Sequence, residues 1–325
     1  MGARRLLTLL VLTWFAAFAA AAAYAQASQN GPLRILVGFP AGGSTDVAAR
    51  LIADRIRDDL GRPVVVENKP GAGGRIAAEA LKRAAPDGST LLLTPMVVTV
   101  LTPLIFKELH YDPAKDFAAV SHIANFQIAL AVSVNHPART VPEFVAWVKS
   151  RPDRASFGTA AAGSQPHFFG VMIGRAIGVD MVHVPYKGAT PLVTDLAGGQ
   201  IPAGISALSD LLELHRAGKL RIIATSGAQR SPLLPTVSTF KEQGFASIEG
   251  TGWLAFYAPA GTPKAVIDEW SKAIAKAVRT PDVAEKLIHL GLEPTGTTPE
   301  ELAAIMAADT ARWAPIVKAS GFTPD

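Results

Sequence analysis

Two turns rich in small and hydroxylated residues carry most of the chemistry that this sequence offers. The first, Phe39–Asp46 (FPAGGSTD), follows an apolar segment, Leu33–Val37, which is typical of a buried strand. A helical pattern over Thr45–Leu60 begins inside this turn. Free backbone N–H groups and the positive end of the helix dipole would meet there, an arrangement that holds a phosphate or a carboxylate.

The second turn, Phe157–His167 (FGTAAAGSQPH), lies far downstream between a strand-like segment, Ala155–Gly158, and a helical pattern over His167–Ile177. Two such turns in one chain predict a site assembled from two halves. His167 stands in the first turn of its helix, where a histidine is more often structural than functional. Beside an anion, however, its ring could donate a hydrogen bond.

The motifs of common catalytic sites are missing from the sequence. It has no G-x-S-x-G elbow, no H-E-x-x-H pair and no phosphate loop ending in Gly-Lys-Ser/Thr. The seven histidines lack metal-ligand spacing, and there is no cysteine to act as nucleophile or soft ligand. We therefore predict no catalytic residue, no metal and no cofactor, and expect a binding protein rather than an enzyme. A hydrolase using Ser44 is the alternative, but no base is identifiable beside it.

The N-terminus has the three parts of a secretory signal over residues 1–25. Arg4 and Arg5 precede an apolar core, and cleavage is expected near Ala25 or Ala27. An uncleaved membrane anchor is the alternative, because the apolar core approaches the roughly 20 residues that a span needs. The formal net charge of +4 includes both signal arginines, and no basic block suits nucleic acid. We expect an exported protein that binds no nucleic acid.

Strand-like and helix-like patterns alternate along the chain, which predicts parallel sheets covered by helices. Further strands are expected at Val64–Glu67, Thr90–Thr94, Gln127–Val134, Met181–Val184, Ile201–Ile205, Arg221–Ala224 and Trp253–Ala258. Further helices are expected at Arg75–Ala84, Val141–Lys149, Ala189–Ala197, Leu208–Arg216, Val237–Gln243, Pro263–Arg279, Val283–Leu290 and Pro299–Ala319.

The length after the signal, about 300 residues, suits two lobes better than one core. The economical arrangement is a discontinuous lobe 1, residues 31–128 plus 252–325, and a lobe 2 of residues 129–251. In open α/β sheets, ligands bind beyond the carboxyl ends of the strands. Because both turns follow such ends, we expect the ligand between the lobes.

Segments spread over the whole mature chain resemble one known family. They are Phe39–Asp46, Glu67–Gly74, Pro86–Gly88, Tyr186–Gly188, Asp195–Leu196, Gly199–Gln200, Ala217–Arg221, Arg230–Ser231 and Ala258–Pro263. On these segments the chain is similar to the Bug family, the extracytoplasmic solute receptors of tripartite tricarboxylate transporters. The resemblance implies an α/β, periplasmic-binding-protein-like fold of type II, whose two lobes close around a di- or tricarboxylate, an acidic amino acid or an aromatic carboxylate.

The resemblance also assigns residues to the site. The first turn would hold the ligand carboxylate through its backbone N–H groups, partly through waters; its assigned residues are Phe39, Pro40 (which itself has no N–H), Ala41, Gly42, Gly43, Ser44 and Thr45. The second turn would close on it through Thr159, Gly163, Ser164 and His167, with Tyr186 and Ser206 on the variable side. Asp46 is expected to support the loop, because a carboxylate repels an anionic ligand and favours a helix N-terminus.

Many members of the family have an aspartate where Ser206 stands. A buried aspartate could receive a ligand ammonium group, and a serine cannot supply that charge. We therefore hypothesise that the ligand is not an amino acid.

The function that the resemblance implies is transport. A monomeric periplasmic receptor would capture a small-molecule carboxylate and deliver it to membrane permease subunits, with the ligand stabilising the closed state by contacting both lobes. A sensory receptor of the same fold, signalling to a membrane kinase, is the alternative. A periplasmic hydrolase is the third and least favoured reading.

Overall fold

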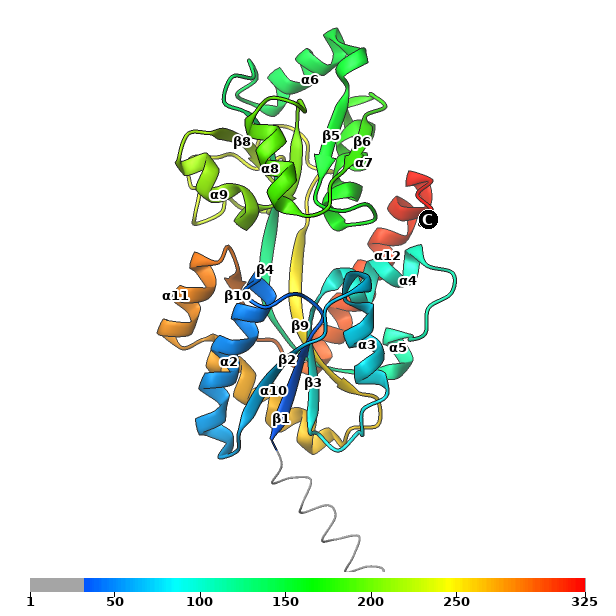
Figure 1. The fold of residues 1–325 in the computed structure, drawn as a ribbon, viewed down its shortest axis with the longest axis vertical. Coiled ribbons are helices and arrows are strands. Elements are labelled where there is room, and N and C mark those ends of the chain that lie inside the picture. The colour runs from blue at the N-terminus through cyan, green and yellow to red at the C-terminus, as the bar shows by residue number, and fades with distance from the viewer. Residues whose placement is uncertain (1–31, 325) are drawn as a thin grey trace, which may run out of the picture.

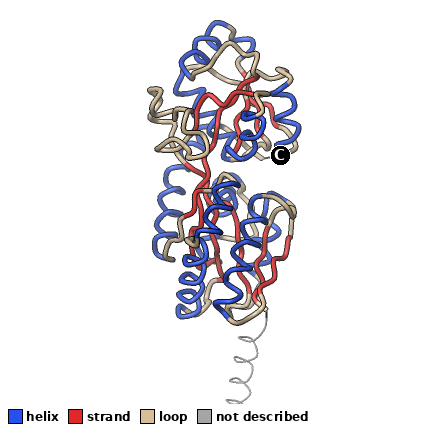
Figure 2. The backbone as a smooth tube through the Cα atoms, turned by 90° about the vertical axis from the view of Figure 1, so that its left-hand side faces the viewer, coloured by secondary structure: helices blue, strands red, loops and turns tan. Residues whose placement is uncertain are grey.

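The computed structural model describes residues 32–324, so the predicted signal peptide, residues 1–25, lies outside the described residues. Two α/β bodies are stacked along the long axis of the molecule, with strands running between them (Figures 1 and 2). We call the body containing β1 (Leu33–Val37) lobe 1 and the body containing α6 (Val141–Ser150) lobe 2.

Lobe 1 is built on three parallel strands, β1, β2 (Val64–Asn68) and β3 (Thr90–Pro95), in the order β2-β1-β3. Alternation along β1 divides its side chains between two cores: Ile35 faces one hydrophobic cluster and Leu36 the other. Because β1 and β3 are almost wholly buried, their sequences read as continuous apolar runs. The helices of lobe 1 are α2 (Ser44–Leu60), α3 (Arg75–Lys82), α10 (Lys264–Val278) and α11 (Pro281–His289).

Lobe 2 holds three further parallel strands, β5 (Ser156–Thr159), β6 (Val182–Pro185) and β7 (Gly204–Ala207). An antiparallel strand, β8 (Leu220–Thr225), pairs with β4. The remaining helices of lobe 2 are α7 (Gln165–Ile177), α8 (Ala189–Ala197) and α9 (Leu208–Arg216). The carboxyl ends of the three parallel strands share one edge, which faces lobe 1: Gly163, just beyond β5, lies near Phe322 and Ile105.

Strand β4 (Phe117–Ser133) belongs to both lobes. Its first part pairs with β9 (Thr251–Pro259) as far as Gln127, and from Ile128 it pairs with β7 and β8. The sequence predicted only the second part of β4. The first part, FAAVSHIAN, lacks a regular alternation because the pairing with β9 shifts register twice, at Ala119/Ser121 and at His122/Ala124.

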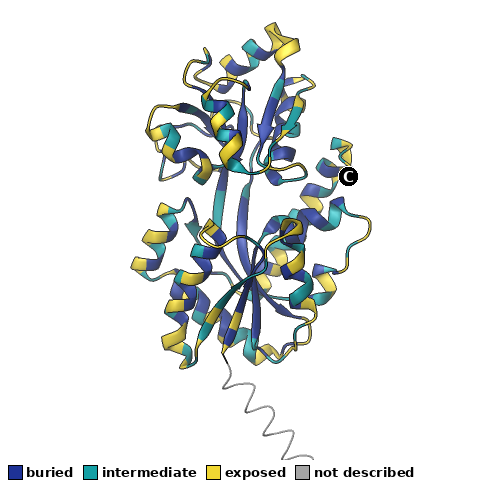
Figure 3. Cartoon of the chain, viewed as in Figure 1, coloured by how far each residue is buried: buried dark blue, intermediate teal, exposed yellow. Residues whose placement is uncertain are grey.

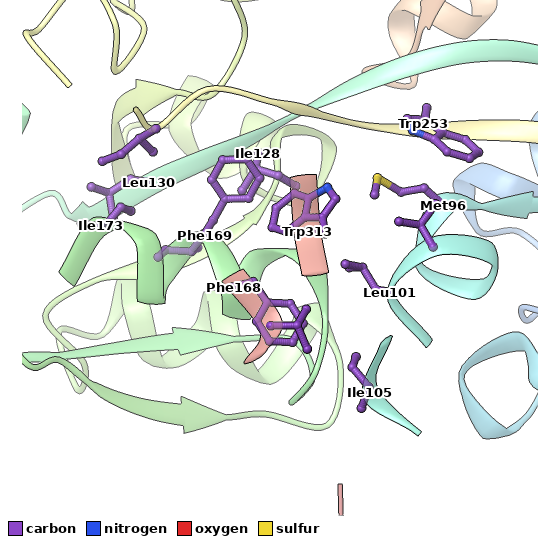
Figure 4. Packing of buried hydrophobic residues seen from close by; sticks show 14 of the residues in the cluster. Met96, Leu101, Ile105, Ile128, Leu130, Phe168, Phe169, Ile173, Trp253 and Trp313 are labelled. Atoms are coloured by element: carbon purple, nitrogen blue, oxygen red, sulfur yellow. The ribbon is translucent and has the colours of Figure 1, made fainter. Parts of the chain in front are cut away.

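Helix α12 (Pro299–Ser320) also connects the two lobes. A capping box between Thr298 and Glu301 begins it. Near its other end Trp313 packs against Phe169 of α7, with ring centroids 5.6 Å apart, and belongs to a cluster that also contains Leu101 of lobe 1 (Figure 4). The helix that the sequence placed in lobe 1 therefore also packs against lobe 2.

One predicted helix is wrong and several short elements were not predicted. Val237–Gln243 forms turns, because the Gln243 side chain is drawn inward to accept the Val141 N–H and donate to the Ile223 carbonyl. The unpredicted elements are η1 (Ala72–Gly74), η2 (Val97–Leu101), α4 (Thr102–Ile105), α5 (Pro113–Asp116), η3 (Pro152–Arg154) and β10 (Glu293–Pro294). Between residues 32 and 324, no helix combines the length and the hydropathy that crossing a membrane requires.

Candidate functional site

The first turn presents unpaired backbone amides to solvent. Residues 40–44 are exposed (Figure 3), and Gly42 adopts a left-handed conformation, φ 83°, that turns the chain into α2. Gly43 is the N-cap of α2 and offers no side chain to cap it. Within the described part of the chain, the N–H groups of Ser44 and Thr45 have no acceptor. The turn therefore leaves the Ser44 and Thr45 amides without an acceptor at the positive end of a helix of 17 residues, although Thr45 itself is buried.

Asp46 holds this turn from behind. Its buried carboxylate accepts the Gly42 N–H at 2.8 Å and the Asn68 amide at 2.9 Å, and it forms an ion pair with Arg50 at 2.9 Å. Burial raises the pKa of Asp46, but the hydrogen bonds from Arg50, Gly42 and Asn68 outweigh burial, so the pKa lies below its usual value. These contacts are those of a supporting residue. Asn68 also donates to the Phe39 carbonyl at 3.1 Å.

We expect Asp46→Ala to lower the free energy of unfolding by about 2–4 kcal/mol, because it leaves three donors around a buried space without their acceptor. Chemical denaturation at neutral pH measures this loss. The matched control is Asp58→Ala on the same helix, where the side chain is 69% exposed. Equal losses in the two variants would contradict the supporting role. Because the Asp46 pKa is lowered on folding, its contribution should also fade below about pH 4.

The second turn likewise exposes amides, and its hydroxyl groups are engaged within the protein. The N–H groups of the exposed residues Ala161 and Ala162 have no acceptor in the described chain. Ser164 caps α7, accepting the His167 N–H and donating to the Ala161 carbonyl at 2.7 Å. Gly163 adopts φ 67°, and a Cβ there would come within 2.8 Å of the Phe322 ring.

Two stacked histidines support the second turn. The rings of His167 and His183 lie 3.9 Å apart at 16°. Nδ1 of His167 accepts the Gly163 N–H at 3.1 Å. The Thr159 hydroxyl donates its one proton to the Ala161 carbonyl, so Nε2–H of His183 donates to that hydroxyl, at 2.7 Å. Burial lowers the pKa of both rings, and for His183 the neighbouring ring adds to the effect, bringing it to about 4.

Several residues predicted to touch the ligand are thus occupied elsewhere. Thr159 and His167 are buried, and their polar side-chain atoms bond within the turn or to its support. Tyr186 donates from its hydroxyl to Asp195 at 2.9 Å, and burial together with Asp195 raises its pKa to about 12. Phe322, near the C-terminus, packs edge-on against His167 at 5.2 Å, a contact too distant in sequence to predict.

Ser206 does not stand alone. At the end of β7 its buried hydroxyl donates to the Asp210 carboxylate at 2.5 Å. Asp210 lies in the first turn of α9, and the sequence reasoning missed it, although a spacing of four residues across a strand–helix junction could have signalled it. A carboxylate therefore lies beside Ser206, which the hypothesis drawn from Ser206 alone did not include.

Both turns expose backbone N–H groups, and these are donors from which an anion can accept hydrogen bonds. No group of three or more His, Asp or Glu side chains in the described residues comes together as a metal site. Amide-lined turns of this kind suit the binding of an anion.

Known proteins match both the sequence and the fold. The family model described as "tripartite tricarboxylate transporter family receptor" matches residues 48–322. The chain is 33% identical to the protein BugT of Bordetella pertussis over 99% of each chain. It is 29% identical to MatC from Rhodopseudomonas palustris, solved with bound malate, with a TM-score of 0.76 over 88% of this chain and 98% of that one.

A further R. palustris protein, solved with adipate, is 31% identical, with a TM-score of 0.81 over 90% of this chain and 98% of that one. These likenesses confirm the predicted fold class, that of the periplasmic binding proteins. The chain belongs to the tripartite tricarboxylate transporter family of receptors, as its resemblance to the Bug proteins predicted.

Proposed function

We propose that this protein captures a small organic carboxylate in the periplasm and delivers it to the membrane permease of a tripartite tricarboxylate transporter. The observation that carries the proposal is the pair of exposed turns, whose amides at Ser44, Thr45, Ala161 and Ala162 have no acceptor in the described chain. The carboxylates bound to two relatives, malate and adipate, support the same ligand class.

The proposed mechanism is lobe closure. A carboxylate that accepts hydrogen bonds from the first turn in lobe 1 and the second turn in lobe 2 stabilises the closed arrangement by its differential affinity. The permease then recognises the closed form. Movement between the lobes would be absorbed near Gln127 and Ile128, where β4 changes pairing partners. We further propose that the signal is cleaved near Ala25 or Ala27 and that the receptor acts as a monomer.

Mass spectrometry of the small molecules released from purified, denatured protein tests the ligand class directly. We expect a carboxylate, and we expect that compound at a hundred times its dissociation constant to stabilise the protein by about 2.7 kcal/mol in thermal unfolding. Release of a non-acidic compound, or no stabilisation by any carboxylate, would contradict the proposal.

An uptake assay in intact cells distinguishes a transport receptor from a sensory receptor. Loss of this receptor should abolish uptake of the radiolabelled ligand by intact cells. Undiminished uptake with a lost transcriptional response to the ligand would favour the sensory receptor. Turnover of an ester or amide of the ligand by the purified protein would favour the hydrolase.

A further inference from the structure

Asp210 presents a carboxylate at the edge of lobe 2 that faces lobe 1. Asp210 lies in the first turn of α9, the helix that follows β7. Strand β7 runs parallel to β5, and the carboxyl end of β5 leads into the second turn. Ser209, the neighbour of Asp210, lies against lobe 1: a Cβ on Gly291, between α11 and β10, would come within 3.2 Å of the Ser209 Cβ. The carboxylate is therefore on the same side of lobe 2 as the amides of the second turn.

No cation within the described residues pairs with Asp210. Its one hydrogen-bond partner is the Ser206 hydroxyl, and it takes part in no ion pair. Its side chain is exposed, while the surrounding protein raises its pKa and the Ser206 bond opposes that rise. Desolvation of the carboxylate opposes ionisation, and the serine donor favours the ionised form. An unpaired carboxylate beside a buried hydroxyl is poorly suited to accept a second anion and well suited to a cation or donor.

We propose that Asp210, positioned by Ser206, selects carboxylates that carry an ammonium group at their other end, and disfavours those that carry a second carboxylate there. This inference rests on the proposed function and narrows it. The amides of the two turns hold the ligand carboxylate, and the Asp210 carboxylate receives the ligand ammonium. The ligand class is then a zwitterionic amino carboxylate, the reverse of what Ser206 alone predicted.

Ser206 orients the Asp210 carboxylate and carries no charge of its own. Its hydroxyl is 1% exposed and fixed at the end of a buried strand, so it holds the Asp210 carboxylate in one orientation. Removing the hydroxyl should leave the charge in place but let the side chain turn toward bulk solvent. Ser206→Ala is therefore expected to weaken amino carboxylate binding by a few-fold, less than the loss of the charge itself.

Matched pairs of ligands test the proposal by isothermal titration calorimetry. The pairs are succinate and 4-aminobutyrate, glutarate and 5-aminopentanoate, and adipate and 6-aminohexanoate; within each pair the number of carbons is the same and an aminomethyl group replaces the second carboxylate. At the chain length that fits best, we expect the parent to bind the amino carboxylate at least tenfold more tightly. Asp210→Asn, which keeps the size of the side chain, should lose that preference and bind the dicarboxylate more tightly than the parent does.

The control variant is Glu213→Gln, which removes one negative charge from the same helix at a side chain that is 82% exposed. It should bind both members of each pair as the parent does. If the parent prefers dicarboxylates and Asp210→Asn changes neither affinity, this inference fails while the carboxylate receptor stands. If no carboxylate of either series binds the folded parent, the proposed function fails and the inference with it.

Discussion

Gly43→Asp is expected to weaken carboxylate binding at least a hundredfold while the protein unfolds within a few degrees of the parent. Gly43 is the N-cap of α2 with φ −73° and ψ 163°, an extended conformation that aspartate adopts readily. A Cβ there would meet nothing closer than the Pro40 carbonyl, at 3.5 Å. The new carboxylate would accept hydrogen bonds from the helix amides that we propose for the ligand, and an aspartate cap stabilises a helix by only a few tenths of a kcal/mol relative to glycine. The side chain would thus act as a tethered competing anion.

Gly43→Ala separates this effect from the mere presence of a side chain. Alanine is a poor cap, so this variant should be slightly less stable than the parent. It should nevertheless bind the carboxylate within a few-fold of the parent affinity, since it leaves the amides free. Calorimetric titration with the released ligand and thermal unfolding measure the two properties on each variant. If Gly43→Asp binds like the parent, the first turn is not the site.

The parts of the candidate site whose backbone geometry is predictable from the sequence are those encoded locally. An apolar strand, a glycine turn and a helix start follow one another within Leu33–Leu60, so the geometry of the first turn is set by neighbours in the chain. The support of that turn is not local. Asn68 reaches it from the end of β2, and nothing in the segment around Asn68 distinguishes this contact from an ordinary solvated turn.

The second turn shows the same limit more strongly. Its strand, cap and helix were predictable from Ser156–Ile177, and the structure has them. Its packing partner Phe322 comes from the far end of the chain, delivered by α12. The irregular first part of β4 was missed for a related reason, since only its partner β9 makes that sequence extended.

Ser206 illustrates a different kind of error. Many members of the family have an aspartate at this position, so a comparison of this position alone indicates that the chain has lost a negative charge. The local charge depends instead on all the side chains that lie close together in the fold. Asp210, four residues further along the chain, places its carboxylate beside the Ser206 hydroxyl. Position-by-position comparison therefore took no account of the carboxylate that the fold brings to Ser206.

Because of the stacked pair His167 and His183, we expect the free energy of unfolding to fall in mild acid. The pKa of His183 falls on folding from an ordinary value of 6.5 to about 4, because the ring is buried and lies against His167. Between about pH 6.5 and pH 4, the His183 side chain is therefore protonated in the unfolded chain and neutral in the folded protein. The stabilisation is complete above about pH 6.5 and is lost as the pH falls toward 4, where the folded protein also protonates. At about 1.4 kcal/mol for each pKa unit, the loss would be on the order of 3 kcal/mol for a fully buried ring, and solvent screening of this partly exposed ring reduces it to about 1–2 kcal/mol.

His183→Gln tests this origin, because a glutamine amide can still donate to Thr159 but does not titrate. Denaturant unfolding at intervals between pH 7 and pH 4 should show a shallower decline in this variant than in the parent. Buried His122 and partly buried His136, whose pKa values desolvation also lowers, contribute equally to both curves, so the difference isolates the pair. His110→Gln, at an exposed histidine, should follow the parent. If His183→Gln declines as steeply as His110→Gln, then the stacked pair does not govern the acid sensitivity of the second turn.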